Sequence, residues 1–255
     1  PSGIATYSQT GAQYGTKLIW LSAWTFPLMA IIQEMCARIA LVTGRGLASN
    51  IKRIFSRKVL YICTIFLFIA NTFNIGADIG AMAKSAQLIY PALDFNFLVL
   101  FIGLLVLALE IIIPYKKYVK YLKWFALSLL AYVATALMIH MDWGHLLKSL
   151  VIPHLSFNKE EIILITAILG TTVSPYLFFW QTAEELEEEI VEGKVTIKER
   201  RGTNDVEIKK MRKDVWSGMF YSNLIMFFII AVCANTLFVN GVTDIGTADQ
   251  AAQAL

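Results

Sequence analysis

A proline interrupts an apolar segment of membrane length at Ser174-Pro175, and Thr171 and Thr172 lie just before the interruption. Inside a helix, a proline donates no backbone N–H, and its ring clashes with the carbonyl group four residues earlier, here that of Thr171. In hydrocarbon, backbone groups released in this way must be satisfied by protein, water or a bound ion. Transporters commonly build their binding sites at such interrupted helices. The sequence therefore predicts a broken helix with free polar backbone groups inside the membrane.

The residues around this break offer oxygen atoms to a cation. Thr171 supplies its carbonyl, Ser174 a hydroxyl and Tyr176 a phenol at the start of the next half-helix. Such hard donors suit Mg²⁺, Ca²⁺ or Mn²⁺ better than soft metals such as Cu(I). A plain proline kink, which membrane helices tolerate, is the alternative interpretation.

A polar stripe runs along the first segment of the chain. Thr6, Gln9, Thr10 and Gln13 recur at i, i+3, i+4 and i+7, which places them on one helical face. A span with such a stripe faces the interior of a helix bundle or a water path. Close packing of small residues would explain the threonines, but it explains the two glutamines less well. We therefore expect Thr6 and Gln9 to line an ion pathway.

The second segment carries Glu34 and Arg38 four residues apart, so the two side chains can pair and neutralise each other. We interpret them as a structural or gating pair near one end of the segment. A place for Glu34 in the ion pathway is the alternative.

The third segment has Asn71, Asn74 and Asp78 on one face, at i, i+3 and i+7. A carboxylate near the centre of a span is costly, and it is a functional candidate for that reason. We predict that Asn74 and Asp78 attract the ion or relay protons. The alternative is that Asp78 pairs with a neighbouring helix, for instance through Lys84.

The composition is that of a membrane protein, with 57% hydrophobic residues among 255 and a mean hydropathy of +0.60. A net charge of +3 argues against nucleic acid as a partner. The three cysteines all fall in apolar segments and match neither a disulfide framework nor a zinc site. No cluster of catalytic residue types lies at a common depth, so we expect neither enzymatic activity nor a resident cofactor.

Seven segments are expected to enter the membrane, the first as half a span, at 2–15, 18–42, 59–88, 95–114, 124–141, 162–181 and 219–239. Three loops, at 43–58, 115–123 and 184–214, hold 17 of the 22 Lys and Arg residues. These loops share one side if every segment crosses once, and the positive-inside rule places that side in the cytoplasm. We therefore predict a multi-pass protein of the cell membrane, surrounded by lipid bilayer. The acidic run at 184–189 is expected to extend the preceding helix.

Four motifs point to one family when they are taken together. They are PSGIAT at 1–6 followed by QTGAQYG at 9–15, QEMCAR at 33–38 followed by VTG at 42–44, GTTVSPY at 170–176, and QAAQAL at 250–255. In this combination the chain resembles the Nramp family of divalent-metal transporters, over nearly its whole length.

The resemblance implies an all-α, LeuT-like bundle of inverted five-helix repeats, with broken first and sixth helices. Such proteins move Mn²⁺ or Fe²⁺, commonly with protons, by alternating access. The family's metal ligands are an Asp and an Asn of the first helix, a Met sulfur of the sixth, and a carbonyl one turn before that Met. The Asp would precede Pro1. Gly3 stands at the place of the Asn, Ser174 at that of the Met, Tyr176 at that of a nearby His, and Thr171 supplies the carbonyl.

Two of these differences change the expected chemistry. Serine in place of methionine removes the soft ligand that favours transition metals over Mg²⁺ and Ca²⁺. Tyrosine in place of histidine removes a group that titrates near neutral pH. Both changes resemble the Nramp-related magnesium transporters.

We therefore predict a secondary transporter that moves divalent cations, Mg²⁺ or Mn²⁺ with Fe²⁺ as a further candidate. Residues 1–255 would form a single transmembrane domain of about seven spans, a fragment holding the first repeat and the start of the second. A LeuT-fold symporter for amino acids or other organic solutes is the alternative, in which the broken helices hold a carboxylate. An acidic residue before Pro1 would favour the cation.

Overall fold

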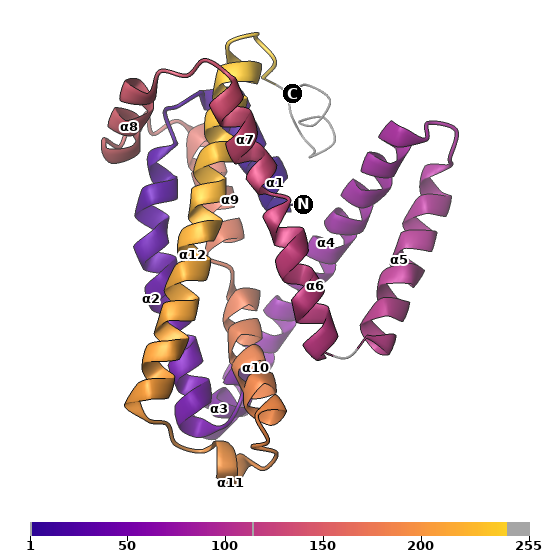
Figure 1. Cartoon of the computed structure of the whole chain (residues 1–255), viewed down its shortest axis with the longest axis vertical. Helices are drawn as coiled ribbons and strands as arrows, with labels where there is room; N and C mark the ends of the chain where they lie inside the picture. Colours follow the sequence, from indigo (N-terminus) through magenta and orange to yellow (C-terminus); the bar gives the residue numbers. More distant parts are fainter. Residues whose placement is uncertain (1, 114, 244–255) are drawn as a thin grey trace. The chain divides into compact units, whose positions relative to one another are not determined.

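The computed structural model describes residues 2–113 and 115–243, and the regular elements there are all helical (Figure 1). In chain order they are α1 (Ser2–Tyr14), α2 (Trp20–Thr43), α3 (Leu47–Ile54), α4 (Arg57–Ile89), α5 (Phe95–Ile112), α6 (Tyr115–Leu127), α7 (Leu130–Met138), α8 (Trp143–Val151), α9 (Lys159–Thr172), α10 (Pro175–Val191), α11 (Ile197–Arg200), α12 (Asp205–Cys233) and the π-helical turn η1 (Ala234–Phe238).

Within the described residues, five helical stretches are long and apolar enough to cross a membrane. They are Trp20–Thr43, Arg57–Ile89, Phe95–Ile112, Lys159–Val191 and Asp205–Phe238. These stretches, together with the all-helical structure, agree with the predicted all-α membrane protein. The single transmembrane domain and the inverted repeat stay predictions.

The lysine-rich stretch 115–123 is helical, which corrects its assignment to a loop. It forms most of α6, and a turn at 128–129 then separates α6 from α7. Lysine is a good helix former, and here it alternates with tyrosine, valine and leucine, so a run of basic residues does not end the helix.

The last long helix, α12, also begins earlier than the predicted start at 219. The side-chain oxygen of Asn204 accepts hydrogen bonds from the backbone N–H groups of Val206 (3.0 Å) and Glu207 (2.9 Å). It thereby satisfies donors that the first turn of a helix leaves unpaired. The charged segment that follows is therefore helical, and Met211 and Val215 bury their side chains there.

The helices form two compact units, and the first comprises the described residues of 1–24, 74–172 and 223–255. Its main core joins the chain around the start of α2 to α8, α9 and α12, through Leu18, Ile19, Leu21, Leu146, Leu164, Ile168, Met226, Phe227, Ile230 and Ala231. A smaller core holds the end of α4 against α5, and it contains Ala83, Leu98 and Ile102. There Lys84 lies over the ring of Phe95, 4.9 Å from its centroid.

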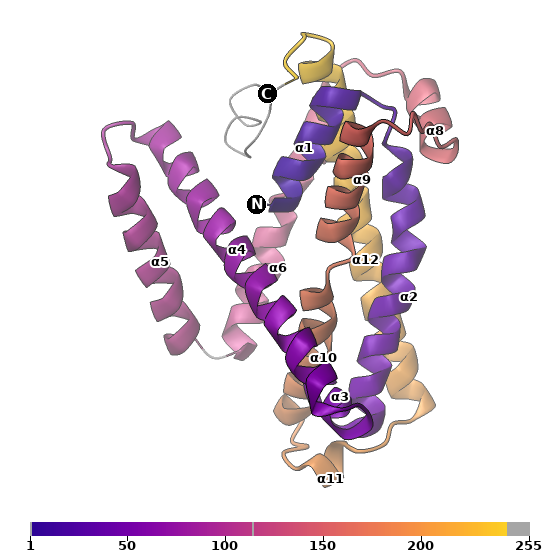
Figure 2. The same ribbon diagram turned by 180° about the vertical axis from the view of Figure 1, so that it is seen from behind.

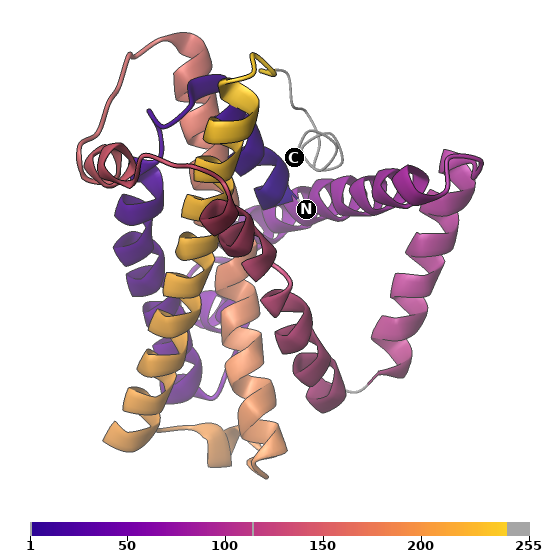
Figure 3. The same ribbon diagram turned by 45° about the horizontal axis from the view of Figure 1, so that its top comes forward.

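In this first unit, α1 packs beside α9 and against the end of α12 (Figures 2 and 3). A Cβ added to Gly11 would lie 2.5 Å from the carbonyl oxygen of Ile230 and 2.8 Å from the Cβ of Cys233. Gly15 ends α1 with a φ of +57°, a conformation that favours glycine. The absence of a side chain at Gly11 thus allows the two helices to approach this closely.

The second unit comprises residues 25–73 and 173–222. Its core lies between α2 and α12 and is formed by Ala37, Leu41, Met211 and Val215. The ring of Phe26 meets Trp216 and Phe220 edge-on, at centroid distances of 5.7 Å each. This unit also holds α3, which packs against α10, and the charged loop that connects α10 to α12.

Candidate functional site

The predicted break at Ser174-Pro175 is present in the structure. The helix α9 ends at Thr172, and α10 begins at Pro175, which occupies its first turn. Ser174 between them has an extended backbone (φ −88°, ψ 136°) and is 3% exposed. Because Pro175 has no N–H, the carbonyl of Thr171 loses its usual helical donor. The break lies within Lys159–Val191, a stretch that is long and apolar enough to cross a membrane.

Two threonine hydroxyls stabilise the last turn of α9. The hydroxyl of Thr171 donates to the carbonyl of Ala167 (2.8 Å), and that of Thr172 donates to the carbonyl of Ile168 (2.7 Å). These bonds turn both hydroxyls back along their own helix. Both hydroxyl protons are thus used within α9, and the backbone carbonyl of Thr171 stays the ion ligand that we predict from the sequence.

A hydrogen bond joins α1 to the end of α9 just before the break. The hydroxyl oxygen of Tyr7 lies 3.0 Å from that of Thr172. A Cβ added to Gly3 would contact the ring of Tyr7 at 3.4 Å, so Tyr7 lies beside the Gly3 backbone. Gly3, Tyr7 and Thr172 thus form one corner of the first unit. Ser174 and Tyr176 belong to the second unit.

Tyr7 is a residue that the sequence interpretation missed. It follows Thr6 of the polar stripe directly, but its own position lies about 100° further round the helix. Only the contact with Thr172 shows that its hydroxyl makes a polar link near the break.

The residues of the polar stripe of α1 differ in how far they are buried. Thr10 is fully buried, and its hydroxyl donates to the carbonyl of Thr6 at 2.7 Å. Thr6 and Gln9 are half-buried. Gln13 lines a cavity of about 490 Å³, whose other described lining residues are Tyr14, Asn158, Glu160 and Thr243. The C-terminal end of the stripe, at Gln13, therefore lies at a polar cavity, whereas Thr10 packs against the protein.

The polar residues of α4 lie on its less exposed face. Asn71, Asn74 and Asp78 are half-buried, whereas most of the residues between them are exposed. The three residues thus lie on one side of α4, as their spacing predicts, and the role of Asn74 and Asp78 in attracting the ion or relaying protons stays a prediction. Lys84, the partner suggested for Asp78, lies over Phe95.

Glu34 forms the predicted pair with Arg38 and also holds α2 to α12. Its Oε1 accepts hydrogen bonds from Arg38 Nη2 (2.7 Å) and from Arg212 Nε (2.9 Å). Its Oε2 accepts one from Trp216 Nε1 at 2.7 Å. We call these four residues the Glu34 clamp. An acceptor with three donor side chains is well suited to holding two helices together.

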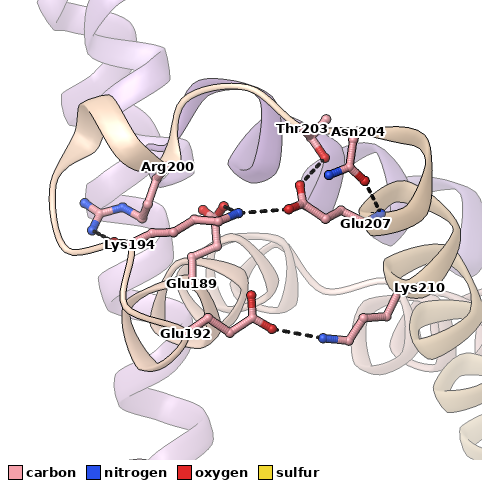
Figure 4. A network of polar contacts seen from close by, with 8 residues as sticks. All are labelled: Glu189, Glu192, Lys194, Arg200, Thr203, Asn204, Glu207 and Lys210. Carbon is pink, nitrogen blue, oxygen red and sulfur yellow. Dashed lines mark hydrogen bonds and ion pairs between the residues drawn. The ribbon is translucent and has the colours of Figure 1, made fainter.

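A second charged network ties the end of α10 to the start of α12 (Figure 4). Lys194 Nζ lies 3.1 Å from Glu189 Oε1 and 3.0 Å from Glu207 Oε1. The bond to Glu207 raises the pKa of Lys194 above its usual value. Lys210 pairs with Glu192 at 3.1 Å. The acidic end of α10 is thus partly neutralised by the loop that follows it, and α10 extends through the acidic run as predicted.

The donor chemistry around the break is that of neutral oxygens. Among residues 2–113 and 115–243, no group of three or more His, Cys, Asp or Glu side chains is arranged to hold a metal. The residues at the break itself, Thr171, Ser174 and Tyr176, offer carbonyl and hydroxyl oxygens. Such donors suit hard cations that keep part of their water shell.

Comparison with known proteins places this architecture in a family. The model of the Nramp family, described as natural resistance-associated macrophage protein-like, matches residues 1–255. The divalent metal cation transporter MntH of Klebsiella pneumoniae (strain 342) is 27% identical over 268 residues, covering 100% of this chain and 59% of the relative. MntH of Pectobacterium carotovorum is 26% identical over 263 residues, and MntH of Erwinia tasmaniensis 25% over 264 residues; each alignment covers 98% of this chain.

The chain spans 58–59% of the length of these curated relatives. The family model, in contrast, matches it from end to end. The motifs at the helix break and in α1 lie within that match. This chain therefore belongs to the Nramp family.

Proposed function

We propose that this chain is part of a transporter that moves a divalent metal cation across a membrane, with the cation bound where α9 and α10 are interrupted. The observation that carries the proposal is the break itself, which leaves a carbonyl without its helical donor inside a membrane-length apolar stretch. The names of the curated relatives, divalent metal cation transporters, support it.

The ligands we propose are the Thr171 carbonyl and the Ser174 hydroxyl, with the Gly3 backbone and the Tyr176 phenol as further donors. All are neutral oxygens, and none is a sulfur. A site of this kind favours Mg²⁺ or Mn²⁺ and leaves Fe²⁺ as a weaker candidate, because soft ligands are what enrich transition metals. The metal is cargo in this proposal, which assigns no catalytic residue and no resident cofactor.

We place the ion pathway along the polar face of α1, with Thr6 and Gln9 below the cavity that Gln13 and Glu160 line. The size and polar lining of this cavity support the proposal. Asn74 and Asp78 of α4 would attract the ion or carry protons. We propose that transport proceeds by alternating access in a LeuT-like arrangement of inverted repeats.

The test is a flux assay with the full-length protein in liposomes. Uptake of ²⁸Mg²⁺ and of ⁵⁴Mn²⁺ is measured against protein-free liposomes, with and without an imposed pH gradient. We expect saturable uptake of at least one of the two ions. Absence of uptake of both ions, together with uptake of an amino acid, would show an organic-solute symporter on the same scaffold and would refute the proposal.

A further inference from the structure

The segment between α2 and α4 carries a concentration of unbalanced positive charge. Residues 44–58 contain five Lys or Arg residues and no Asp or Glu. The segment includes α3 and lies between two helices that can each cross a membrane, Trp20–Thr43 and Arg57–Ile89. It must therefore lie close to the membrane surface wherever these two helices enter the bilayer.

One side of α3 is held firmly against the protein. The Asn50 side-chain amide donates to Thr43 Oγ1 (2.9 Å) and to the carbonyl of Arg45 (3.0 Å). The backbone N–H of Leu47 donates to Thr182 Oγ1 of α10 at 3.2 Å. Asn50 is 6% exposed. These bonds fix which residues α3 turns outward.

The outward side combines basic and apolar side chains. Lys52 and Arg53 occupy the last turn of α3, and both are exposed. Ile54 and Phe55 follow, with exposures of 74% and 57%. Arg57 and Lys58 are exposed at the start of α4. We call residues 52–58 the basic surface.

The cations of the basic surface are available to a ligand. In the part of the chain that the structure describes, none of the four forms an ion pair, although five ion pairs occur elsewhere among those residues. The segment 184–214, from the end of α10 to the start of α12, differs, because its eight basic residues stand beside ten acidic ones. There Lys194, Lys210 and Arg212 are paired with glutamates.

We propose that the basic surface docks anionic phospholipid headgroups of the leaflet that α2 and α4 enter. Arginine and lysine recognise the phosphate, and clusters of basic residues next to membrane helices attract anionic lipid. Ile54 and Phe55 extend from the same surface and enter the boundary between headgroups and acyl chains. This docking rests on membrane insertion of α2 and α4 and not on transport of any ion.

Native mass spectrometry of the purified full-length protein tests the proposal directly. The protein in detergent is titrated with phosphatidylglycerol, phosphatidylcholine or inorganic phosphate. Phosphatidylglycerol should bind most tightly. Lys52→Gln combined with Arg53→Gln should weaken its binding about thirtyfold, at about a factor of five for each basic residue, and leave phosphatidylcholine unaffected.

Lys209→Gln combined with Lys213→Gln is the matched control, because it removes the same charge from exposed positions near the start of α12. It should leave phosphatidylglycerol binding unchanged. Equal losses in the two double variants would show a general effect of net charge and would overturn the proposal. Inorganic phosphate that competes as well as the lipid would overturn it too, since the surface would then be a phosphate site.

A second measurement tests whether the basic surface enters the lipid headgroup region. In vesicles, the fluorescence of the tryptophan introduced by Phe55→Trp is obtained by subtracting that of the unmodified protein. Brominated phosphatidylglycerol should quench it more than brominated phosphatidylcholine does. Equal quenching by the two lipids, or quenching by neither, would contradict docking at this surface. Ion flux in the same vesicles is a separate readout, so loss of lipid selectivity and loss of transport can be told apart.

Discussion

Replacing Glu34 by glutamine should destabilise the second unit, because Glu34 is the shared acceptor of the Glu34 clamp. Its side chain is only 12% exposed, whereas those of Arg38 and Arg212 are 40% and 52% exposed. A glutamine of nearly the same shape keeps one acceptor oxygen but turns an NH₂ group toward the remaining donors. The fold should survive, since the apolar core of Ala37, Leu41, Met211 and Val215 is untouched.

The expected loss follows from the exposure of each partner. The pair with Arg38, four residues away, contributes about 0.3–0.5 kcal/mol, and the half-exposed pair with Arg212 at most about 1 kcal/mol. The bond from Trp216 to an ionised acceptor contributes about 1.5–3 kcal/mol, because the donor is partly buried. Glu34→Gln should therefore lower the free energy of unfolding by roughly 2–4 kcal/mol.

A double-mutant cycle isolates the largest of these contributions. Trp216→Phe removes the N–H and keeps an aromatic ring to pack edge-on against Phe26. Unfolding of the wild type, the two single variants and the double variant is measured by SDS titration in mixed micelles. The coupling between positions 34 and 216 should be at least about 1 kcal/mol. It should also persist at high salt, which screens the exposed arginine pairs first.

Glu192→Gln is the control for this cycle. Its single ion pair, with Lys210, has both side chains more than half exposed. The change should therefore cost less than about 1 kcal/mol. Strictly additive effects at positions 34 and 216, or a loss for Glu34→Gln no larger than that for Glu192→Gln, would refute the assignment of Glu34 as the link between α2 and α12.

Two further predictions concern α1 and the break. Gly11→Ala should destabilise the protein by about 1–3 kcal/mol in the same titration, because its Cβ would meet the Ile230 backbone. Gly76→Ala, where a Cβ meets nothing within 4 Å, should leave stability unchanged or slightly raised, and equal effects at both positions would contradict the packing of α1. Ser174→Met should shift competition in the flux assay toward Mn²⁺ and Cd²⁺ over Mg²⁺, because it introduces a soft sulfur ligand. An unchanged competition profile would argue against Ser174 as a ligand.

Features that depend on a single helix or a single proline were predicted correctly from the sequence. The break at Ser174-Pro175 follows from the missing N–H and the ring of a single proline, and the structure has it there. The Glu34–Arg38 pair follows from helical spacing, since residues four apart share a face. Asn71, Asn74 and Asp78 share a face, as the same periodicity predicts, and the structure shows that all three are half-buried.

Helix boundaries were less accurate where charge was taken as the end of a helix. The lysines of α6 and the charged start of α12 are both helical. Lysine and glutamate form helices readily. A charged segment therefore indicates that the chain leaves an apolar environment more reliably than it indicates the end of a helix. Asn204 was the available signal for α12, as a capping residue directly before the charged stretch.

By itself, the sequence determined that this is a helical membrane protein with a broken helix at Ser174-Pro175 and a polar stripe on its first helix. These properties depend on composition, on one proline and on helical periodicity, which act over a few residues. Only the tertiary structure decided that Tyr7 meets Thr172, that Thr10 is packed away from the cavity, and that Glu34 also binds Arg212 and Trp216, 178 and 182 residues further along the chain. Such contacts depend on how separate helices pack against one another, and spacing within a single helix carries no information about its partner.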